Sequence, residues 1–372
     1  MTARRRWRAG LARAGAGLLA LAWAAAGCGG PAVGGANEVR AGVPAGPTAR
    51  GTGEHMAERA GRYEWRASNS APRGCPMELL AGDFFYAGGS LYVPKAGVHA
   101  GWGREVSVHL LDTGPQPMPD TLEVGFFSWL EDRLYHGRFP LPKDSIERLF
   151  RDGYKSYEDR SGHATFRTLV AGVAPGGAVA VWASGPERQV EVFFGQAAPS
   201  NGDWHTVMGM PPTVNRQALV DETLADEARR DPLVPVMRKD PPPAGRWAAY
   251  RARYRWRPAF EGVGQPARLH RVEFLNGERD YLEVGGAAAG APAARPAPRF
   301  VLFVDPQARR SYEVTFDEEE VHQAFARLGA DGRPVELVFA ASGGKGPLRV
   351  TLRGEAGSVP LEKAKVDVFA AA

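Results

Sequence analysis

Cysteine is scarce in this chain: its 372 residues include only Cys28 and Cys75. Two cysteines cannot build a disulfide framework, and if Cys28 is modified, Cys75 has no partner left in the chain. Cys75 stands just before an apolar run that begins at Met77. This setting is typical of a free cysteine that packs as a small buried hydrophobe rather than one that reacts.

Recognisable catalytic and metal-binding motifs are also missing. The eight histidines have no ligand spacing on one predicted helix, and neither a nucleophile elbow nor a phosphate-binding loop occurs. Asp83 and the pair Glu131-Asp132 are the candidates for acid–base chemistry. The simpler interpretation places the pair in a solvent-facing hairpin turn, with Asp83 ending a strand or accepting backbone N–H groups. We therefore expect no catalytic residue, no metal site and no cofactor.

No apolar run reaches the length of a membrane span. Arg4, Arg5, Arg6 and Arg8 precede an apolar segment at residues 14–26, which is the order of a secretory signal peptide. About 13 residues fall short of the roughly 20 that cross a bilayer, so the segment predicts a cleaved signal rather than a transmembrane helix.

The predicted cleavage site abuts the first cysteine. Ala25-Ala26-Gly27-Cys28 resembles a bacterial lipobox, which predicts a signal peptide at residues 1–27 and lipidation of Cys28 as the first mature residue. An ordinary signal peptidase site beside an incidental cysteine is the alternative. More than one acyl chain would anchor the protein firmly. Gly29 is not the aspartate that marks inner-membrane retention, which favours the periplasmic face of the outer membrane.

Net charge nearly vanishes after processing. Five of the 46 basic residues lie in the signal peptide, so 41 face 42 acidic residues, a net charge of −1. The basic isoelectric point therefore describes the precursor, and the mature chain gives no electrostatic reason to expect a nucleic-acid partner.

The chain beyond the signal peptide divides into a tether and two folded parts. Residues 28–60 are rich in Gly, Ala, Pro and Thr without apolar periodicity, which predicts a lipidated, disordered tether reaching roughly 30 Å from the bilayer. We then expect an α+β fold of two tandem domains, each a mainly antiparallel sheet with one packed helix. The expected ranges are 61–198 for the first domain, 199–245 for a proline-rich connector with one helix at 214–230, and 246–372 for the second domain.

Alternation and turn residues place the individual elements. A helix should begin after Pro142 and end at Gly153, and a second, capped by Asp317, should bury Val321, Ala324, Phe325 and Leu328. The composition of residues 285–298 predicts a flexible loop. The expected strands are 62–70, 77–86, 104–111, 121–130, 133–140, 165–173, 178–184 and 188–195 in the first domain, with a hairpin at 299–316 and strands at 335–341, 347–353 and 361–369 in the second.

The predicted second domain repeats short sequence motifs of the first domain. Tyr63-Glu64-Trp65-Arg66 returns as Tyr254-Arg255-Trp256-Arg257, and the spacing of Tyr135 and Phe139 returns in Tyr312 and Phe316. Duplication of one domain explains this repeat, and coincidence between two common layouts remains the alternative.

Aromatic residues are more frequent in several predicted strands than a solvent-exposed surface favours. Adjacent residues of a strand point to opposite faces of the sheet, so one aromatic side chain of each adjacent pair must be covered by another part of the protein or by a partner. Core packing is the main interpretation, with an interface for a partner as the alternative. The residues concerned are Phe84, Phe85, Tyr86, Phe126, Phe127, Trp129 and Trp182.

Several motifs together resemble a bacterial lipoprotein family known as domain of unknown function 2931. Similarity covers residues 60–200, extends to 250–257 and is faint from 258 onward. The motifs are Tyr63-Glu64-Trp65-Arg66, Leu80-Ala81-Gly82-Asp83-Phe84-Phe85, Gly101-Trp102-Gly103, Pro119-Asp120-Thr121-Leu122, Trp129, Tyr135-His136-Gly137-Arg138-Phe139-Pro140-Leu141-Pro142, and residues 173–182.

The resemblance assigns no site residue. It implies a context, because such lipoproteins resemble immunity partners of type VI secretion phospholipase effectors. The expectation is a lipid-anchored envelope binding protein that occludes such an effector through its aromatic sheet face or its loops, without turnover. The alternative is a structural or housekeeping envelope lipoprotein, which binds a housekeeping partner or peptidoglycan. An enzyme is the third hypothesis, and the sequence offers it no nucleophile, base and orienting residue.

Overall fold

A computed structural model describes residues 61–95, 97–98, 101–106, 114–263, 268–282, 291–341 and 348–370. The predicted signal peptide, Cys28 and the tether therefore lie outside the described residues. Within the described residues, no helix combines the length and the apolar character needed to cross a membrane.

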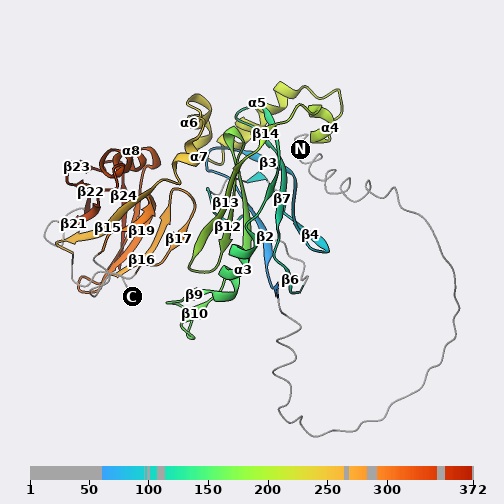
Figure 1. Ribbon diagram of the computed structural model, residues 1–372. Helices are drawn as coiled ribbons and strands as arrows, with labels where there is room; N and C mark the ends of the chain where they lie inside the picture. The colour runs from blue at the N-terminus through green and yellow to red at the C-terminus, as the bar shows by residue number, and fades with distance from the viewer. Residues whose placement is uncertain are drawn as a thin grey trace, which may run out of the picture. The chain divides into compact units, whose positions relative to one another are not determined.

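The first half contains one α-helix among many strands (Figure 1). That helix, α3 (Lys143–Asp152), begins after Pro142 and ends at Gly153, as the sequence predicts. The strands are β1 (Arg62–Tyr63), β2 (Arg66–Ser70), β3 (Met77–Tyr86), β4 (Gly89–Tyr92), β5 (Gly97–Val98), β6 (Gln116–Pro117), β7 (Thr121–Ser128), β8 (Arg133–Pro140), β9 (Tyr154–Lys155), β10 (His163–Ala164), β11 (Thr168–Ala174), β12 (Ala178–Ser184), β13 (Gln189–Gln196) and β14 (Ala198–Pro199), with a 3₁₀ turn at Pro175–Gly177.

The second half repeats this layout with one longer helix. Asp317 caps α8 (Glu318–Gly329) by accepting the N–H of Glu320 at 2.9 Å. The expected helix face is buried, including Val321 and Phe325. The strands are β15 (Arg253–Glu261), β16 (Arg268–Phe274), β17 (Arg279–Asp280), β18 (Ala293–Pro296), β19 (Pro298–Asp305), β20 (Arg310–Thr315), β21 (Val335–Ala341), β22 (Leu348–Gly354), β23 (Gly357–Pro360) and β24 (Lys365–Ala370).

The connector is more helical than the sequence predicts. Alongside the expected helix, α5 (Arg216–Ala228), it contains α4 (Trp204–Met208) and α6 (Leu233–Lys239), and α7 (Arg246–Ala249) comes next. Asp203 and Asn215 cap α4 and α5 with side-chain oxygens. The proline-rich composition hid α6 because Pro232 stands at its N-cap, a place where proline costs little.

Strand pairing is almost entirely antiparallel, which confirms the α+β class. The two parallel pairs are β2 with β11 and β15 with β21. Each half contributes to two of the three largest sheets rather than to the single sheet expected. The three largest sheets have the orders β2-β11-β12-β13-β17-β16-β19-β20-β24, β14-β8-β7-β3-β4 and β18-β15-β21-β22-β23. The nine-stranded sheet thus contains strands of both halves. The predicted domain boundaries stay predictions.

The two halves repeat the same pairing pattern. In each half an early strand pairs in parallel with a strand that follows the helix. The last strand of each half returns beside the second strand of the hairpin that precedes the helix. The bulge of β3 after Leu79 recurs in β16 after Leu269. Stacked rings also recur, since Phe126 and Tyr135 correspond to Phe303 and Tyr312. The repeat predicted from the letters therefore extends to strand order and register.

Three apolar cores hold these sheets and helices together. One lies between the two sheets of the first half and includes Ile146 and Phe150 of α3, and a second centres on Phe303 and Phe325 of the second half. Strands β11 and β12 are buried along their whole length because successive side chains enter these two different cores. The third core joins the outer face of β7 to the connector helices.

Other expectations needed smaller corrections. Residues 293–296 form β18 instead of a loop, because alternate backbone groups there pair with β15. The expected final strand at 361–369 begins later than predicted. Leu361 to Ala364 form a turn after β23, and β24 starts at Lys365. Residues 104–106 are not in a strand, and the remainder of that expected strand lies outside the described residues.

Candidate functional site

The aromatic sheet face is covered by the chain itself. Phe126 and Phe127 are both fully buried, one in the core of the first half and the other beneath the connector. Trp204 of α4 faces Phe127 with ring centroids 6.4 Å apart. Core packing is therefore confirmed for the buried aromatic residues, whereas Phe85 and Tyr86 of β3 are only partly buried. The sequence could not show this because the cover comes from a segment that looked irregular.

The residues proposed for chemistry lie apart. Asp83 sits inside β3, half-buried, and accepts a hydrogen bond from the Ser90 hydroxyl at 3.4 Å rather than from backbone N–H groups. Burial raises the pKa of Asp83. Glu131 accepts the N–H of Gly176 at 3.0 Å, and Asp132 binds Arg216 at 2.8 Å, so this pair fastens neighbouring segments instead of facing solvent.

Cys75 is buried, with 1% of its surface exposed. Burial raises the pKa of its thiol to about 12, so the thiol stays protonated at neutral pH. This confirms its packing role. Among the described residues, no group of three or more His, Cys, Asp or Glu side chains could hold a metal ion.

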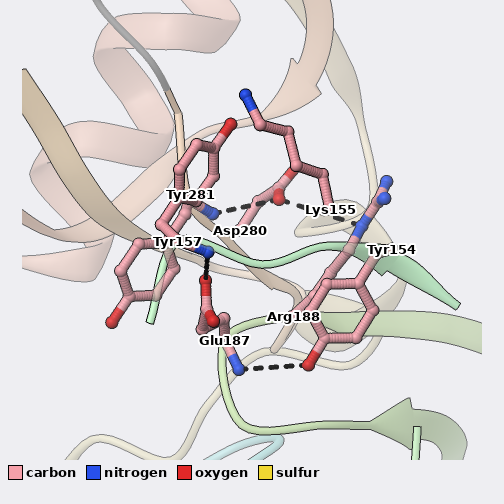
Figure 2. Close-up of a pocket in the computed structure, with 7 residues that line it drawn as sticks. All are labelled: Tyr154, Lys155, Tyr157, Glu187, Arg188, Asp280 and Tyr281. Atoms are coloured by element: carbon pink, nitrogen blue, oxygen red, sulfur yellow. Dashed lines mark hydrogen bonds and ion pairs between the residues drawn. The ribbon is translucent and has the colours of Figure 1, made fainter. Parts of the chain in front are cut away.

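A polar pocket of about 200 Å³ lies between the β9–β10 hairpin, the turn before β13 and β17 (Figure 2). Its lining residues are Tyr154, Lys155, Tyr157, Glu187, Arg188, Asp280 and Tyr281. The sequence reasoning missed this pocket because its residues come from three segments without a motif.

Hydrogen bonds within the pocket hold its own walls together. The buried Glu187 carboxylate accepts the N–H of Tyr157 at 2.9 Å, and the Glu187 N–H donates to the Tyr154 hydroxyl at 3.3 Å (Figure 2). The same carboxylate also accepts the N–H of Glu158 at 3.2 Å. Tyr281 donates to Glu158 at 2.8 Å, and burial raises the Tyr281 pKa to about 12. This pocket therefore uses its polar groups to fasten the β9–β10 hairpin.

A larger groove of about 590 Å³ lies beside α3, within the roughly 300–1,000 Å³ typical of binding sites. One side of α3 forms one wall, and residues 190–192 of β13 form the other. Apolar and charged side chains both contribute. The lining residues are Pro142, Ser145, Arg148, Leu149, Asp152, Gly153, Val190, Glu191 and Val192.

The charged side chains of this groove differ in whether they form ion pairs. Asp152 pairs with Arg151 at 2.9 Å. Glu191 binds Arg251 at 2.5 Å, yet burial raises the Glu191 pKa to about 7. Arg148 is exposed, bonds only the Ser145 hydroxyl at 2.9 Å, and forms no ion pair with any described residue. Arg148 is therefore the charged lining residue with capacity to bind something else.

The corresponding space beside α8 is filled by the chain. Ser145 and Leu149 correspond to Glu320 and Ala324, because both helices bury residues four apart against matching strands. The Glu320 carboxylate accepts the N–H groups of Glu362 at 3.0 Å and Lys363 at 3.1 Å.

The two helices accordingly differ in how closely they pack. Helix α8 lies against β15, β19, β22 and β23, whereas no strand of the described part packs as extensively on α3. An alanine at position 324 permits this close approach, and Leu149 at the matching place adds bulk.

The fold and the groove together define an α+β protein of mainly antiparallel sheets whose first half leaves one face of its helix open. Residues 52–231 match the family described as "Protein of unknown function (DUF2931)", so this part of the chain carries a domain of that family. The match confirms the resemblance and extends past residue 200 into the connector. No curated protein and no solved structure matched the chain.

Proposed function

We propose that this chain is a lipid-anchored binding protein of the cell envelope, and that its partner is a secreted phospholipase which it occludes. The observation that carries the proposal is the open groove beside α3. It lies wholly inside the part of the chain that matches the family, and it has apolar walls with an available cation at its rim. Apolar walls with a few polar groups are the usual composition of a binding site.

Occlusion needs no catalytic group on this chain. A stoichiometric binder acts by covering the partner's active site, and a lipid anchor at Cys28 would hold it at the membrane where a phospholipase works. In this proposal the anchor supplies proximity and the folded part supplies recognition. The groove and its rim are the proposed binding site, and the burial of Phe126 and Phe127 by the chain itself supports this choice over the aromatic strands.

The test mixes the processed, lipidated chain in nanodiscs with a phospholipase encoded beside it. We expect a stable one-to-one complex and loss of lipid hydrolysis when the chain reaches equimolar amount. Full hydrolysis at excess chain would overturn the phospholipase proposal and leave the structural or housekeeping lipoprotein as the better hypothesis.

Anchoring has its own test. Cys28→Ser should abolish incorporation of labelled palmitate and release the protein from the membrane fraction. Cys75→Ser is the matched control, because that buried thiol has no part in anchoring. A Cys28→Ser protein that stays in the membrane fraction would contradict the lipid anchor.

A further inference from the structure

The second half shows what occupies a groove of this kind. The edge strand of its five-stranded sheet, β23, ends at Pro360, and the next four residues form a turn beside the start of α8. Leu361 is buried there, and Ala364 packs on the same core. In the first half β13 runs on to Gln196 instead, and among the described residues no equivalent turn reaches α3.

The filling segment is held by its backbone as well as by its apolar side chain. Glu320 accepts its two N–H groups, and Lys363 Nζ lies 3.8 Å from Asp317 Oδ1. Peptide is therefore compatible with the space between such a helix and the sheet edge.

The first-half groove differs in its charge. Ser145 replaces the carboxylate of Glu320, and the exposed Arg148 takes the place of the uncharged Gln323. A cation without an ion-pair partner beside Leu149, Val190 and Val192 complements an apolar side chain that has a carboxylate close by.

We propose that the α3 groove binds a short peptide segment of the partner protein, in which an apolar side chain enters between Leu149 and β13 and a neighbouring acidic side chain pairs with Arg148. The inference rests on the proposed function in that it names the partner's recognition element. It specifies where the partner docks and which chemistry the docking segment carries.

The probe is the hexapeptide Val-Pro-Leu-Glu-Lys-Ala, the sequence of residues 359–364, labelled with fluorescein and capped at both ends. Its anisotropy is measured against the full processed chain in nanodiscs. We expect saturable binding that Arg148→Glu weakens by about fivefold or more, since an attraction becomes a repulsion. A peptide with lysine in place of its glutamate should bind the Arg148→Glu chain better than the wild-type chain.

Arg151→Glu is the matched control, because it reverses a charge on the same helix outside the groove lining. A peptide with alanine in place of its leucine tests the apolar contact and should lose most of its binding. Equal effects of Arg148→Glu and Arg151→Glu, no rescue by the charge-swapped peptide, or no saturable binding would each overturn the inference. Stronger competition by a single-chain phospholipid than by unlabelled peptide would assign the groove to lipid and overturn it too.

The same variants separate this inference from the proposed function. If a phospholipase is inhibited equally by the wild-type chain and by Arg148→Glu, the function stands and the groove is not its docking site. If no phospholipase is bound but the peptide data show the expected pattern, the groove stands and the phospholipase is the wrong partner.

Discussion

Asp83 in β3 and Glu273 in β16 hold the same position in the two halves, four residues beyond the matching bulges. Their electrostatics are opposite. Burial raises the pKa of Asp83, whose hydrogen-bond partner is the neutral Ser90. Burial also acts on Glu273, but Arg299, Arg104 and Arg271 outweigh it and hold the Glu273 pKa at about 2. A repeated backbone thus does not carry repeated chemistry.

The difference arises from where each strand lies. Glu273 belongs to the nine-stranded sheet that contains strands of both halves, where Arg104 from the first half reaches it at 3.0 Å. Asp83 belongs to the smaller sheet of the first half. The shared features are the buried apolar residues, and the divergent ones include the charged groups through which the two halves contact each other.

The largest predicted effects come from the shared anchors. Trp65 and Trp256 are buried, face Phe84 and Phe274, and donate to the carbonyls of Pro117 and Pro296, each at 3.1 Å. Replacing either tryptophan by alanine should lower the free energy of unfolding by about 4 kcal/mol, because a large cavity forms and a carbonyl loses its donor.

Urea unfolding of both variants measures this effect, with tryptophan-to-phenylalanine changes as milder versions should the alanine variants not fold. If only one of the two substitutions lowers the free energy of unfolding, the two tryptophans correspond in position but not in their contribution to stability.

The next largest effect should come from Glu273→Gln. This substitution should lower the free energy of unfolding by about 3 kcal/mol at neutral pH, because three arginines lose their counter-charge in a buried site. Asp83→Asn is the matched change in the other half and should cost little or stabilise, because burial disfavours the Asp83 charge. Equal losses in the two variants would contradict the opposite electrostatics.

The pH dependence sharpens the same contrast. The Glu273 pKa falls from 4.5 to about 2 on folding, so its stabilisation is present above pH 4.5 and is lost as the pH falls through that interval. The wild-type advantage over Glu273→Gln should therefore shrink by up to about 3 kcal/mol between pH 5 and pH 2.

Asp83, whose pKa is raised, should give the reverse sign: its contribution is greatest at low pH and is lost as the pH rises. Urea midpoints measured at several pH values decide this. A wild-type advantage over Glu273→Gln that stays constant across the acid range would refute the assignment.

The smallest predicted effect concerns the space beside α8, which the chain fills, and the groove beside α3, which is open. Glu320→Ala should lower stability by about 1 kcal/mol and speed amide exchange at Glu362 and Lys363, whose N–H groups lose their acceptor. Ser145→Ala, the matched change on α3, should leave exchange unchanged throughout the folded part. Unchanged exchange at both amides in Glu320→Ala would show that the segment is held by Leu361 alone.

Sequence reasoning located most elements for identifiable reasons. Alternation fixed β3, β8 and β12 to the residue, and Pro142, Gly153 and Asp317 fixed helix ends because each has a local backbone role. It failed at β18, where alanine and proline conceal a pairing that β15 supplies. It also missed helices α4 and α6 of the connector, which bury Trp204 and Val234 in the core beside β7 and β8.

The candidate site was much less predictable. Arg148, Leu149 and Val190 carry no motif, and neither separation in sequence nor helical periodicity says whether the space between α3 and β13 is empty or filled. The nearest signal in the sequence was the repeat itself, which invites a comparison of Ser145 with Glu320.

The sequence alone determined the α+β class, the repeated motifs, the family and the burial of Cys75, because these depend on local periodicity and composition. Tertiary structure decided which aromatic face is covered, which carboxylate gains three arginines and which helix keeps an open side. Those outcomes depend on distances between segments far apart in the chain, since burial and ion pairing act through space and change steeply over a few ångströms.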